Sequence, residues 1–206
     1  MKPTLEEFTE LKNKSSEWAK SRLEDPKTVI IDCETTGILR NDPTTEIVQF
    51  SAINTSGKPL LSLLLKPAQP LRDELVAIHG ISNEMVLDSP TFPQVSKIIS
   101  FILEGKHVVA YNADFDIALL VHLYKKYDLP APKFSGASCC MDRYSEWIGQ
   151  WNASKEGIRW QKLPNLSGMP AHDALSDCVS TLRVMELMAN GKDLSELNSE
   201  EIALDF

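Results

Sequence analysis

The sequence predicts an α/β fold in which helices pack on a mixed β-sheet. Three strand-like segments come first, and after Pro67 helical patterns alternate with a further short strand. This order is typical of a sheet that helices cover. The chain has 206 residues, enough for one such domain. A domain of this size should bury roughly 70% of its unfolded-chain surface.

The first half of the chain predicts one helix and then three strands. Residues 4–24 form the helix, because Thr4 and Glu7 have the spacing of a capping box and Pro26 follows its end. The Val-Ile-Ile run at 29–31 is apolar on both faces, as in a central strand. We expect the strands at residues 28–34, 46–54 and 59–66, the last two joined as a hairpin by Ser-Gly-Lys.

The second half predicts helices that alternate with one strand. Gly105 is a helix stop, and the prolines at 130 and 132 break a later helix. In order, we expect a short helix at 71–78, a helix at 93–103, a strand at 106–111 and helices at 113–127 and 173–189. The corresponding organisation is an N-terminal helical extension over 1–26, the main domain over 27–190 and an acidic tail over 191–206.

Charge and composition exclude several functions. The net charge of −8 argues against a generic clamp on nucleic acid, which needs clustered Lys and Arg. The apolar stretch at 60–65 is far shorter than the roughly 20 residues of a membrane-spanning helix. The N-terminal residues lack the apolar core of a signal peptide, so we expect a cytoplasmic protein without a membrane partner. Reduced thiols are expected at Cys33, Cys139, Cys140 and Cys178, which lack metal-type spacing.

Two carboxylates on the first strand are the first candidate site. Asp32 and Glu34 are two residues apart, so both side chains lie on one face of the strand. Such a pair resists burial unless a cation neutralises it, and carboxylate oxygens select Mg²⁺ or Mn²⁺. The alternative is a pair at the strand end that is simply exposed to solvent.

A second group of polar residues lies where the short strand passes into a helix. Asp114 and Asp116 are near the helix start, where capping and the helix dipole favour one aspartate. This account does not explain two. Phe115 between them can pack in the core, offer a platform for a base, or do both.

The third candidate is a histidine before the last helix. In one continuous helix, His172 and Asp177 would be separated by about 500° of turn, roughly 140° apart around the axis, and could not share a site. If Pro170 keeps His172 in the entry loop and Asp173 caps the helix, the histidine can fold over the site that Asp177 reaches.

Together these segments resemble the three motifs of the DEDDh, or DnaQ-like, family of 3′-5′ exonucleases. The resemblance spans residues 28–188, and a His-Gly-Ile segment at 79–81 resembles one that these proteins carry between the first two motifs. Each motif is weak alone, but the three in this order are specific. They read Asp32-x-Glu34-Thr35-Thr36-Gly37, Asn112-x-x-Phe115-Asp116 and His172-x-Ala174-x-x-Asp177.

The resemblance implies a ribonuclease H-like fold and two Mg²⁺ ions, with Mn²⁺ as a substitute, that hold the scissile phosphate. Asp32 would bridge both ions. Glu34 and Asp177 would bind the ion that holds the nucleophilic water, and Asp116 would support the other. His172 would be the general base. Two ions about 3.5–4 Å apart stabilise the entering and leaving oxygens, which agrees with four carboxylates in one site.

The resemblance also implies how the substrate is held. Thr35 and Thr36 would contact the terminal nucleotide, Asn112 would help to hold it, His79 would lie near it and Phe115 is a candidate contact. The expected reaction releases nucleoside 5′-monophosphates from the 3′ end of single-stranded DNA. A proofreading subunit of a polymerase complex and an RNA-trimming exonuclease remain alternatives. A non-catalytic adaptor has no physical need for four converging carboxylates.

Two further segments allow a binding role. Aromatic residues interleaved with basic ones over 143–162 can bind single strands, but their helical spacing favours core packing. The aromatic face consists of Tyr144, Trp147, Ile148 and Trp151, and Trp160 follows it. Residues 201–206 weakly resemble the motif by which bacterial replication proteins dock on the sliding clamp. A frayed acidic tail is the favoured interpretation of this segment.

Overall fold

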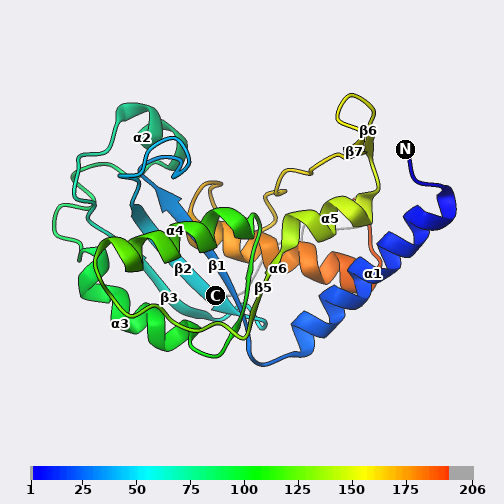
Figure 1. Cartoon of the computed structure of the whole chain (residues 1–206), viewed down its shortest axis with the longest axis horizontal. Coiled ribbons are helices and arrows are strands. Elements are labelled where there is room, and N and C mark those ends of the chain that lie inside the picture. Colours follow the sequence, from blue (N-terminus) through cyan, green and yellow to red (C-terminus); the bar gives the residue numbers. More distant parts are fainter. Residues whose placement is uncertain (1, 195–206) are drawn as a thin grey trace.

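The computed structural model describes residues 2–194 and shows a mixed five-stranded sheet (Figure 1). Its strands are β1 (Thr28–Thr35), β2 (Ile47–Asn54), β3 (Pro59–Leu64), β4 (His107–Ala110) and β5 (Gly136–Cys139). The strand order is β3-β2-β1-β4-β5. β1 lies in the centre, antiparallel to β2 and parallel to β4, so the prediction of a mixed sheet is confirmed.

Helices cover both faces of this sheet (Figure 1). They are α1 (Leu5–Glu24), α2 (Asp73–His79), α3 (Phe92–Leu103), α4 (Ala113–Lys126), α5 (Cys140–Ile148) and α6 (Ala174–Asn190). α3 and α4 share one hydrophobic core with the sheet, and α1, α5 and α6 share the other. A small separate hairpin, β6 (Trp151–Asn152) and β7 (Gly157–Ile158), lies between α5 and α6 in the sequence.

The central strand β1 divides its side chains between the two cores. Ile31 and Cys33 pack on the side of α3 and α4, whereas Ile30 packs on the side of α6. Because side chains alternate along a strand, Asp32 and Glu34 lie on the α6 side with Ile30. The sequence pattern therefore places both carboxylates on the same face, as predicted.

Because β4 is short, the second half of β1 has no partner strand on that side. The parallel pairing of β1 with β4 ends where Ile30 lies opposite Val109. The later residues of β1 continue to pair with β2, and α4 begins at Ala113, just after β4 ends. The first turns of α4 therefore lie where a longer β4 would have been. From there they can reach the end of β1 that carries Asp32 and Glu34.

The N-terminal helix α1 packs on the domain. Its Ala19 is fully buried in the core shared with α5 and α6. The Trp147 indole N–H of α5 donates to Ser16 Oγ at 3.2 Å, and Lys12 Nζ lies 4.4 Å from the centre of the same ring. The predicted capping box is present, with Thr4 Oγ1 accepting from the Glu7 N–H at 3.2 Å.

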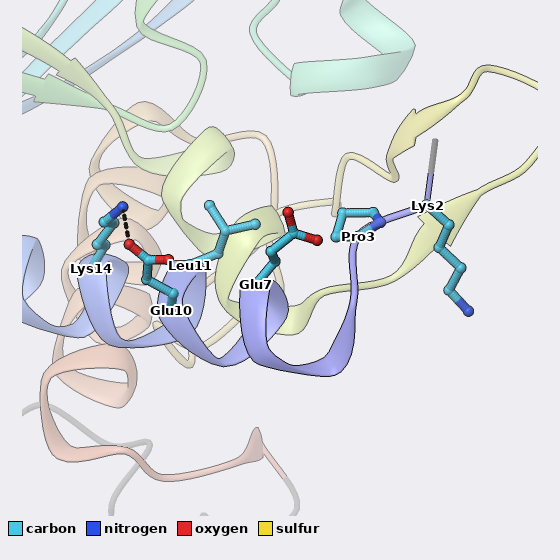
Figure 2. A pocket seen from close by; sticks show the side chains of 6 residues that line it. All are labelled: Lys2, Pro3, Glu7, Glu10, Leu11 and Lys14. Atoms are coloured by element: carbon cyan, nitrogen blue, oxygen red, sulfur yellow. Dashed lines mark ion pairs between the residues drawn. The ribbon is translucent and has the colours of Figure 1, made fainter.

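A shallow pocket lies at the start of α1 (Figure 2). Its lining comes from α1 and the two residues before the N-cap, and the Glu10–Lys14 ion pair at 2.6 Å runs along it. No residue of β1 or α6 contributes to this lining.

Among the described residues, none of the helices has both the length and the apolar character of a membrane span. The clamp-like segment 201–206 lies outside the described residues.

Several elements differ from those that the sequence predicts. The sequence does not predict β5 or the β6–β7 hairpin as elements, because each is short and β5 contains Gly136 and no apolar alternation. For α5, the sequence predicts the helical spacing of Tyr144, Trp147 and Ile148 but not the bounds of the helix. α2 begins at Asp73, two residues later than expected, because the Leu71 carbonyl, which would accept a helical hydrogen bond, instead accepts from Asn83 Nδ2 at 3.1 Å. Core packing is confirmed for Tyr144 and Trp147, which are 3% and 4% exposed.

Candidate active site

Four carboxylates from three elements meet at the open end of β1. Asp32 and Glu34 come from β1, Asp116 from the first turn of α4 and Asp177 from the first turn of α6. Burial raises the pKa of Asp32 well above its usual value, and the charges of the other three carboxylates raise it further. Asp32 therefore lies within electrostatic reach of every other member of the cluster.

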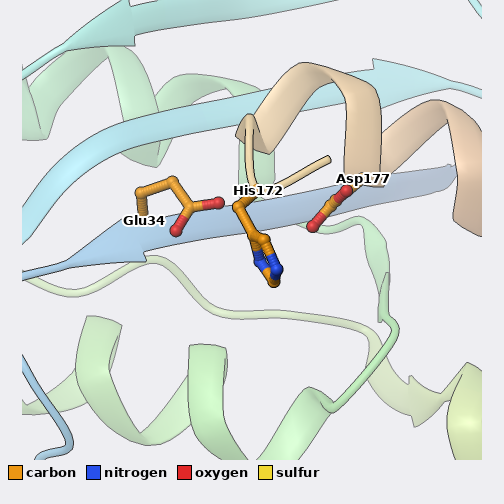
Figure 3. A group of neighbouring side chains, drawn as sticks. All are labelled: Glu34, His172 and Asp177. Atoms are coloured by element: carbon orange, nitrogen blue, oxygen red, sulfur yellow. The ribbon is translucent and has the colours of Figure 1, made fainter. Parts of the chain in front are cut away.

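Glu34, His172 and Asp177 form the tightest part of this cluster. One ligand atom from each lies within 4.8 Å of the others. Figure 3 shows the His172 side chain between those of Glu34 and Asp177, with Glu34 on β1 and Asp177 on α6. The imidazole is exposed, whereas both carboxylates are half-buried. These residues can hold a cation or a water molecule between them.

The backbone before α6 explains how His172 reaches the site. Asp173 is the N-cap of α6 and accepts from the backbone N–H groups of Leu175 and Ser176. His172 therefore lies outside the helix, with a φ of 59°. Its backbone N–H donates to the Asp177 carboxylate. The prediction that His172 belongs to the entry loop is confirmed, and a continuous helix through both residues is excluded.

Asp116 reaches the cluster from the opposite face of the sheet. Its residue is only 3% exposed, and the thiol and backbone N–H of Cys33 hydrogen-bond to its carboxylate. Burial nevertheless raises the pKa of Asp116 to about 7. Cys33 is a free thiol, as are the other three cysteines, which agrees with the expectation from their spacing.

The electrostatics of the cluster fit a divalent cation. Burial raises the pKa of Glu34 to about 7, and the charges of Asp177, Asp173 and Asp116 add to the effect. Burial also raises the pKa of Asp177. Converging carboxylates of this kind repel one another unless a cation is present, and oxygen donors suit Mg²⁺ or Mn²⁺. A simply solvated pair at the strand end, the alternative for Asp32 and Glu34, is not what the structure shows.

Sequence reasoning missed Gln49, which supports this site. In the β1–β2 register Gln49 lies opposite Glu34, and its side chain is hydrogen-bonded to Asp173 and to the Ala174 N–H. The available signal was a buried-type strand in which Gln49 and Ser51, two residues apart, place polar side chains on the same face. Asp173 was expected only as a cap, but its charge also raises the pKa of Glu34.

Four of the residues expected to hold the substrate lie in two places: at the end of β1 with the turn that follows, and at the start of α4. The Thr35 hydroxyl donates to the Gly37 carbonyl at 2.7 Å, and the Thr36 hydroxyl accepts from the Glu46 N–H at 2.9 Å, so both shape the turn after β1. Asn112 and Phe115 line a pocket at the start of α4, the helix that carries Asp116.

His79 belongs near the same site. Burial lowers the pKa of His79, and the charge of His172 lowers it further, which places the two imidazoles within electrostatic reach. His79 Nδ1 accepts from the Ile81 N–H at 3.1 Å.

Comparisons with known proteins agree with this geometry. The profile of the exonuclease family matches residues 29–185. An uncharacterized exonuclease, CP81 of Escherichia phage 186, is 35% identical over 188 residues, covering 85% of this chain and 94% of that protein. The epsilon subunit of DNA polymerase III from Escherichia coli is 30% identical over 111 residues, which is 50% of this chain and only 46% of that subunit.

Solved structures share the fold. The nuclease domain of 3′hExo, a DEDDh family member bound to rAMP, superposes with a TM-score of 0.60 at 22% identity, covering 80% of this chain and 92% of that one. Exonuclease X in complex with 5′ overhanging duplex DNA gives a TM-score of 0.55 at 24% identity, covering 85% and 96%. The ribonuclease H-like fold is thereby confirmed. With its three motifs in order, the chain belongs to the exonuclease family, among the DEDDh 3′-5′ exonucleases.

Proposed function

We propose that this protein removes nucleotides one at a time from the 3′ end of single-stranded DNA and releases nucleoside 5′-monophosphates. The observation that carries the proposal is the convergence of four carboxylates with His172, in which ligand atoms of Glu34, His172 and Asp177 lie within 4.8 Å of one another. A cluster of this kind suits hydrolysis of a phosphodiester with metal assistance.

The carboxylates would hold two divalent cations, Mg²⁺ with Mn²⁺ as a substitute. Asp32 is central in the cluster and would contact both ions, Glu34 and Asp177 would hold one, and Asp116 would support the other. Such ions, when bound, supply positive charge for the phosphate oxygens and make water more acidic. Burial and mutual repulsion raise the pKa values of these carboxylates, and this supports the proposal, because a bound cation would stabilise their charged forms.

His172 would take the proton from the attacking water. Its imidazole is exposed beside two carboxylates, and a histidine side chain can accept a proton near neutral pH. Glu34 and Asp177 would then stabilise the positive imidazolium that forms. The N-cap at Asp173 and the hydrogen bond from the His172 N–H to Asp177 fix the loop, so the imidazole is oriented before substrate arrives.

The 3′-terminal nucleotide would occupy the space between the turn after β1 and the start of α4. Thr35 ends β1 and Thr36 begins that turn, and Asn112 and Phe115 line the pocket at the helix start. His79 would approach from α2. Asn112 is exposed and can hydrogen-bond to the nucleotide, whereas Phe115 is half-buried and can both pack and contact a base.

A proofreading role in a polymerase complex is a second candidate. The observation that favours it is the similarity to epsilon subunits of DNA polymerase III, which spans 43% and 46% of those from Pasteurella multocida and Escherichia coli and 74% of the one from Rickettsia felis. RNA is a third candidate substrate, because one contact to a 2′-hydroxyl can decide between RNA and DNA.

A time course on 5′-labelled single-stranded DNA with Mg²⁺ tests the proposal. The wild type should produce a ladder that shortens from the 3′ end in single steps. Asp177→Asn should produce none, and Asp128→Asn, in an exposed loop, should match the wild type. Matched single-stranded RNA and a duplex with a mismatched 3′ end distinguish the alternatives. An intact strand with the wild type in both Mg²⁺ and Mn²⁺ would overturn the proposal for DNA.

A further inference from the structure

Trp160 is a large aromatic side chain that the fold leaves in solvent. It is 69% exposed, although Tyr144 and Trp147 of the preceding helix are buried. Trp160 follows β7 and lines a pocket of about 680 Å³. The same pocket is lined by Asn112 and Phe115 of the second motif. The exposed indole is therefore continuous with the proposed nucleotide site.

The backbone on each side of Trp160 is held in place. The Arg159 N–H donates to the Gln150 carbonyl at 2.7 Å, which extends the β6–β7 pairing. The Gln161 N–H donates to Ser145 Oγ at 3.0 Å, and the Tyr111 hydroxyl donates to the Gln161 carbonyl at 3.0 Å. The indole is thus presented from a fixed segment, which is the requirement for a stacking platform that loses little entropy on binding.

The other walls of the pocket favour a nucleobase. Ile38, on the turn after β1, is 52% exposed and adds a second apolar wall. Arg40 lines the pocket and is exposed, and a guanidinium can stack on a base or contact a phosphate. Asp114 and Asp142 also line the pocket, so its interior repels phosphate and suits an uncharged aromatic base.

We propose that Trp160 stacks on a base of the substrate strand upstream of the 3′-terminal nucleotide, where the strand leaves the catalytic centre across this pocket. The inference rests on the proposed function and adds the path of the single strand. Aromatic stacking accepts every base, so the platform would bind single strands without sequence preference. The 3′ end would then be held at the carboxylates while the upstream base anchors the strand.

Binding of an eight-nucleotide single strand to an Asp177→Asn background tests this inference apart from turnover. Trp160→Ala should weaken binding by about 5- to 100-fold, the range that alanine substitution of a stacking aromatic gives. Trp160→Phe should restore most of the affinity. Phe101→Ala is the matched control, because Phe101 is 84% exposed on α3 and does not line the pocket.

An abasic scan identifies the stacked nucleotide. Strands that carry one abasic residue at successive positions from the 3′ end should show one upstream position where loss of the base weakens binding. At that position Trp160→Ala should add no further loss, because the partner is already missing. Equal affinity of wild-type and Trp160→Ala backgrounds for every strand would overturn the inference, and it would then point to a protein partner for the exposed indole.

The two proposals fail in different ways. A wild type that degrades the strand while Trp160→Ala and Phe101→Ala bind it equally would leave the exonuclease proposal in place and remove the stacking role. A wild type that degrades no strand, but binds it in a Trp160-dependent manner, would keep the binding path and remove the catalytic proposal.

Discussion

Gln49 Nε2 donates a hydrogen bond of 2.8 Å to Oδ2 of Asp173, the N-cap of α6. The Oε1 atom of the same side chain accepts from the Ala174 N–H at 3.1 Å. In the β1–β2 register Gln49 lies opposite Glu34. One amide therefore joins β2, the partner of the strand that carries Asp32 and Glu34, to the helix start that positions His172 and Asp177.

Replacing this amide should affect turnover more than substrate binding. Gln49→Leu keeps the approximate size and removes both hydrogen bonds, which should cost about 1–3 kcal/mol of stability. Without these hydrogen bonds, we expect the start of α6 to shift. This shift should lower kcat at least tenfold with little change in KM, because a small misplacement of catalytic groups is costly. Steady-state kinetics on a short single strand measure both parameters. A variant with wild-type kcat would remove the positioning role, and Gln94→Leu on α3 controls for loss of an amide elsewhere.

Asp32→Asn should abolish activity and stabilise the metal-free protein. Burial and four carboxylate neighbours disfavour the charged form of Asp32, so an amide relieves repulsion. We expect a higher melting temperature in chelator, at about 2–4 °C per kcal/mol for a domain of this size. Added Mg²⁺ should raise the melting temperature of the wild type more than that of the variant. Residual turnover at the wild-type rate would show that the catalytic centre lies elsewhere.

The stability of the metal-free protein should fall as pH rises from about 4 to 7. Burial raises the pKa of both Glu34 and Asp116 to about 7, whereas unfolded carboxyls titrate near pH 4. In this window the folded state binds more protons than the unfolded state, so the free energy of unfolding decreases with pH. Urea unfolding in chelator at successive pH values measures the slope. Glu34→Gln should flatten it, and parallel slopes for variant and wild type would contradict the assignment.

His172→Ala should lower kcat by about 10²–10⁴, the usual contribution of a general base. Metal binding should be largely kept, because the four carboxylates remain. Calorimetric titration with Mn²⁺ checks the second expectation and rapid-quench turnover the first. A loss of less than tenfold would assign the proton transfer to another group, and the first alternative to examine would be His79, whose imidazole lies near His172.

The sequence predicts how the residues of the candidate site are placed better than it predicts β5 and the β6–β7 hairpin. The period of a strand places Asp32 and Glu34 on one face, and the cap at Asp173 separates His172 from the helix, because both are local effects. β5 is held by its pairing with the distant strand β4, and the β6–β7 hairpin pairs locally but through only two residues of each strand, so neither has a strong local pattern. Gln49 hydrogen-bonds to Asp173 and Ala174, which are 124 and 125 positions away in the sequence. No local pattern encodes these contacts.

The turn after β1 depends on an ion pair between buried Glu46 and the more exposed Lys126, which gives a second pH-dependent effect of opposite sign. Lys126 Nζ lies 2.6 Å from Glu46 Oε1, Tyr127 also donates to this oxygen, and the backbone of Glu46 pairs with that of Thr36. Burial alone would raise the pKa of Glu46, but the hydrogen bonds from Lys126 and Tyr127 outweigh it and lower the pKa.

Glu46→Gln should therefore destabilise the protein at pH 7 by about 1.5–3 kcal/mol, the range for hydrogen bonds to charged groups. A lowered pKa stabilises the fold above the unfolded value near 4.5, and this contribution disappears as pH falls through the folded value. The difference between wild type and variant, measured by urea unfolding, should shrink as the pH is lowered below about 4. Glu10→Gln is the control, because the Glu10–Lys14 pair has the same 2.6 Å length but is exposed and should contribute less than about 1 kcal/mol. Equal effects of the two substitutions at pH 7 would show that burial of Glu46 adds nothing to the turn that carries Thr36.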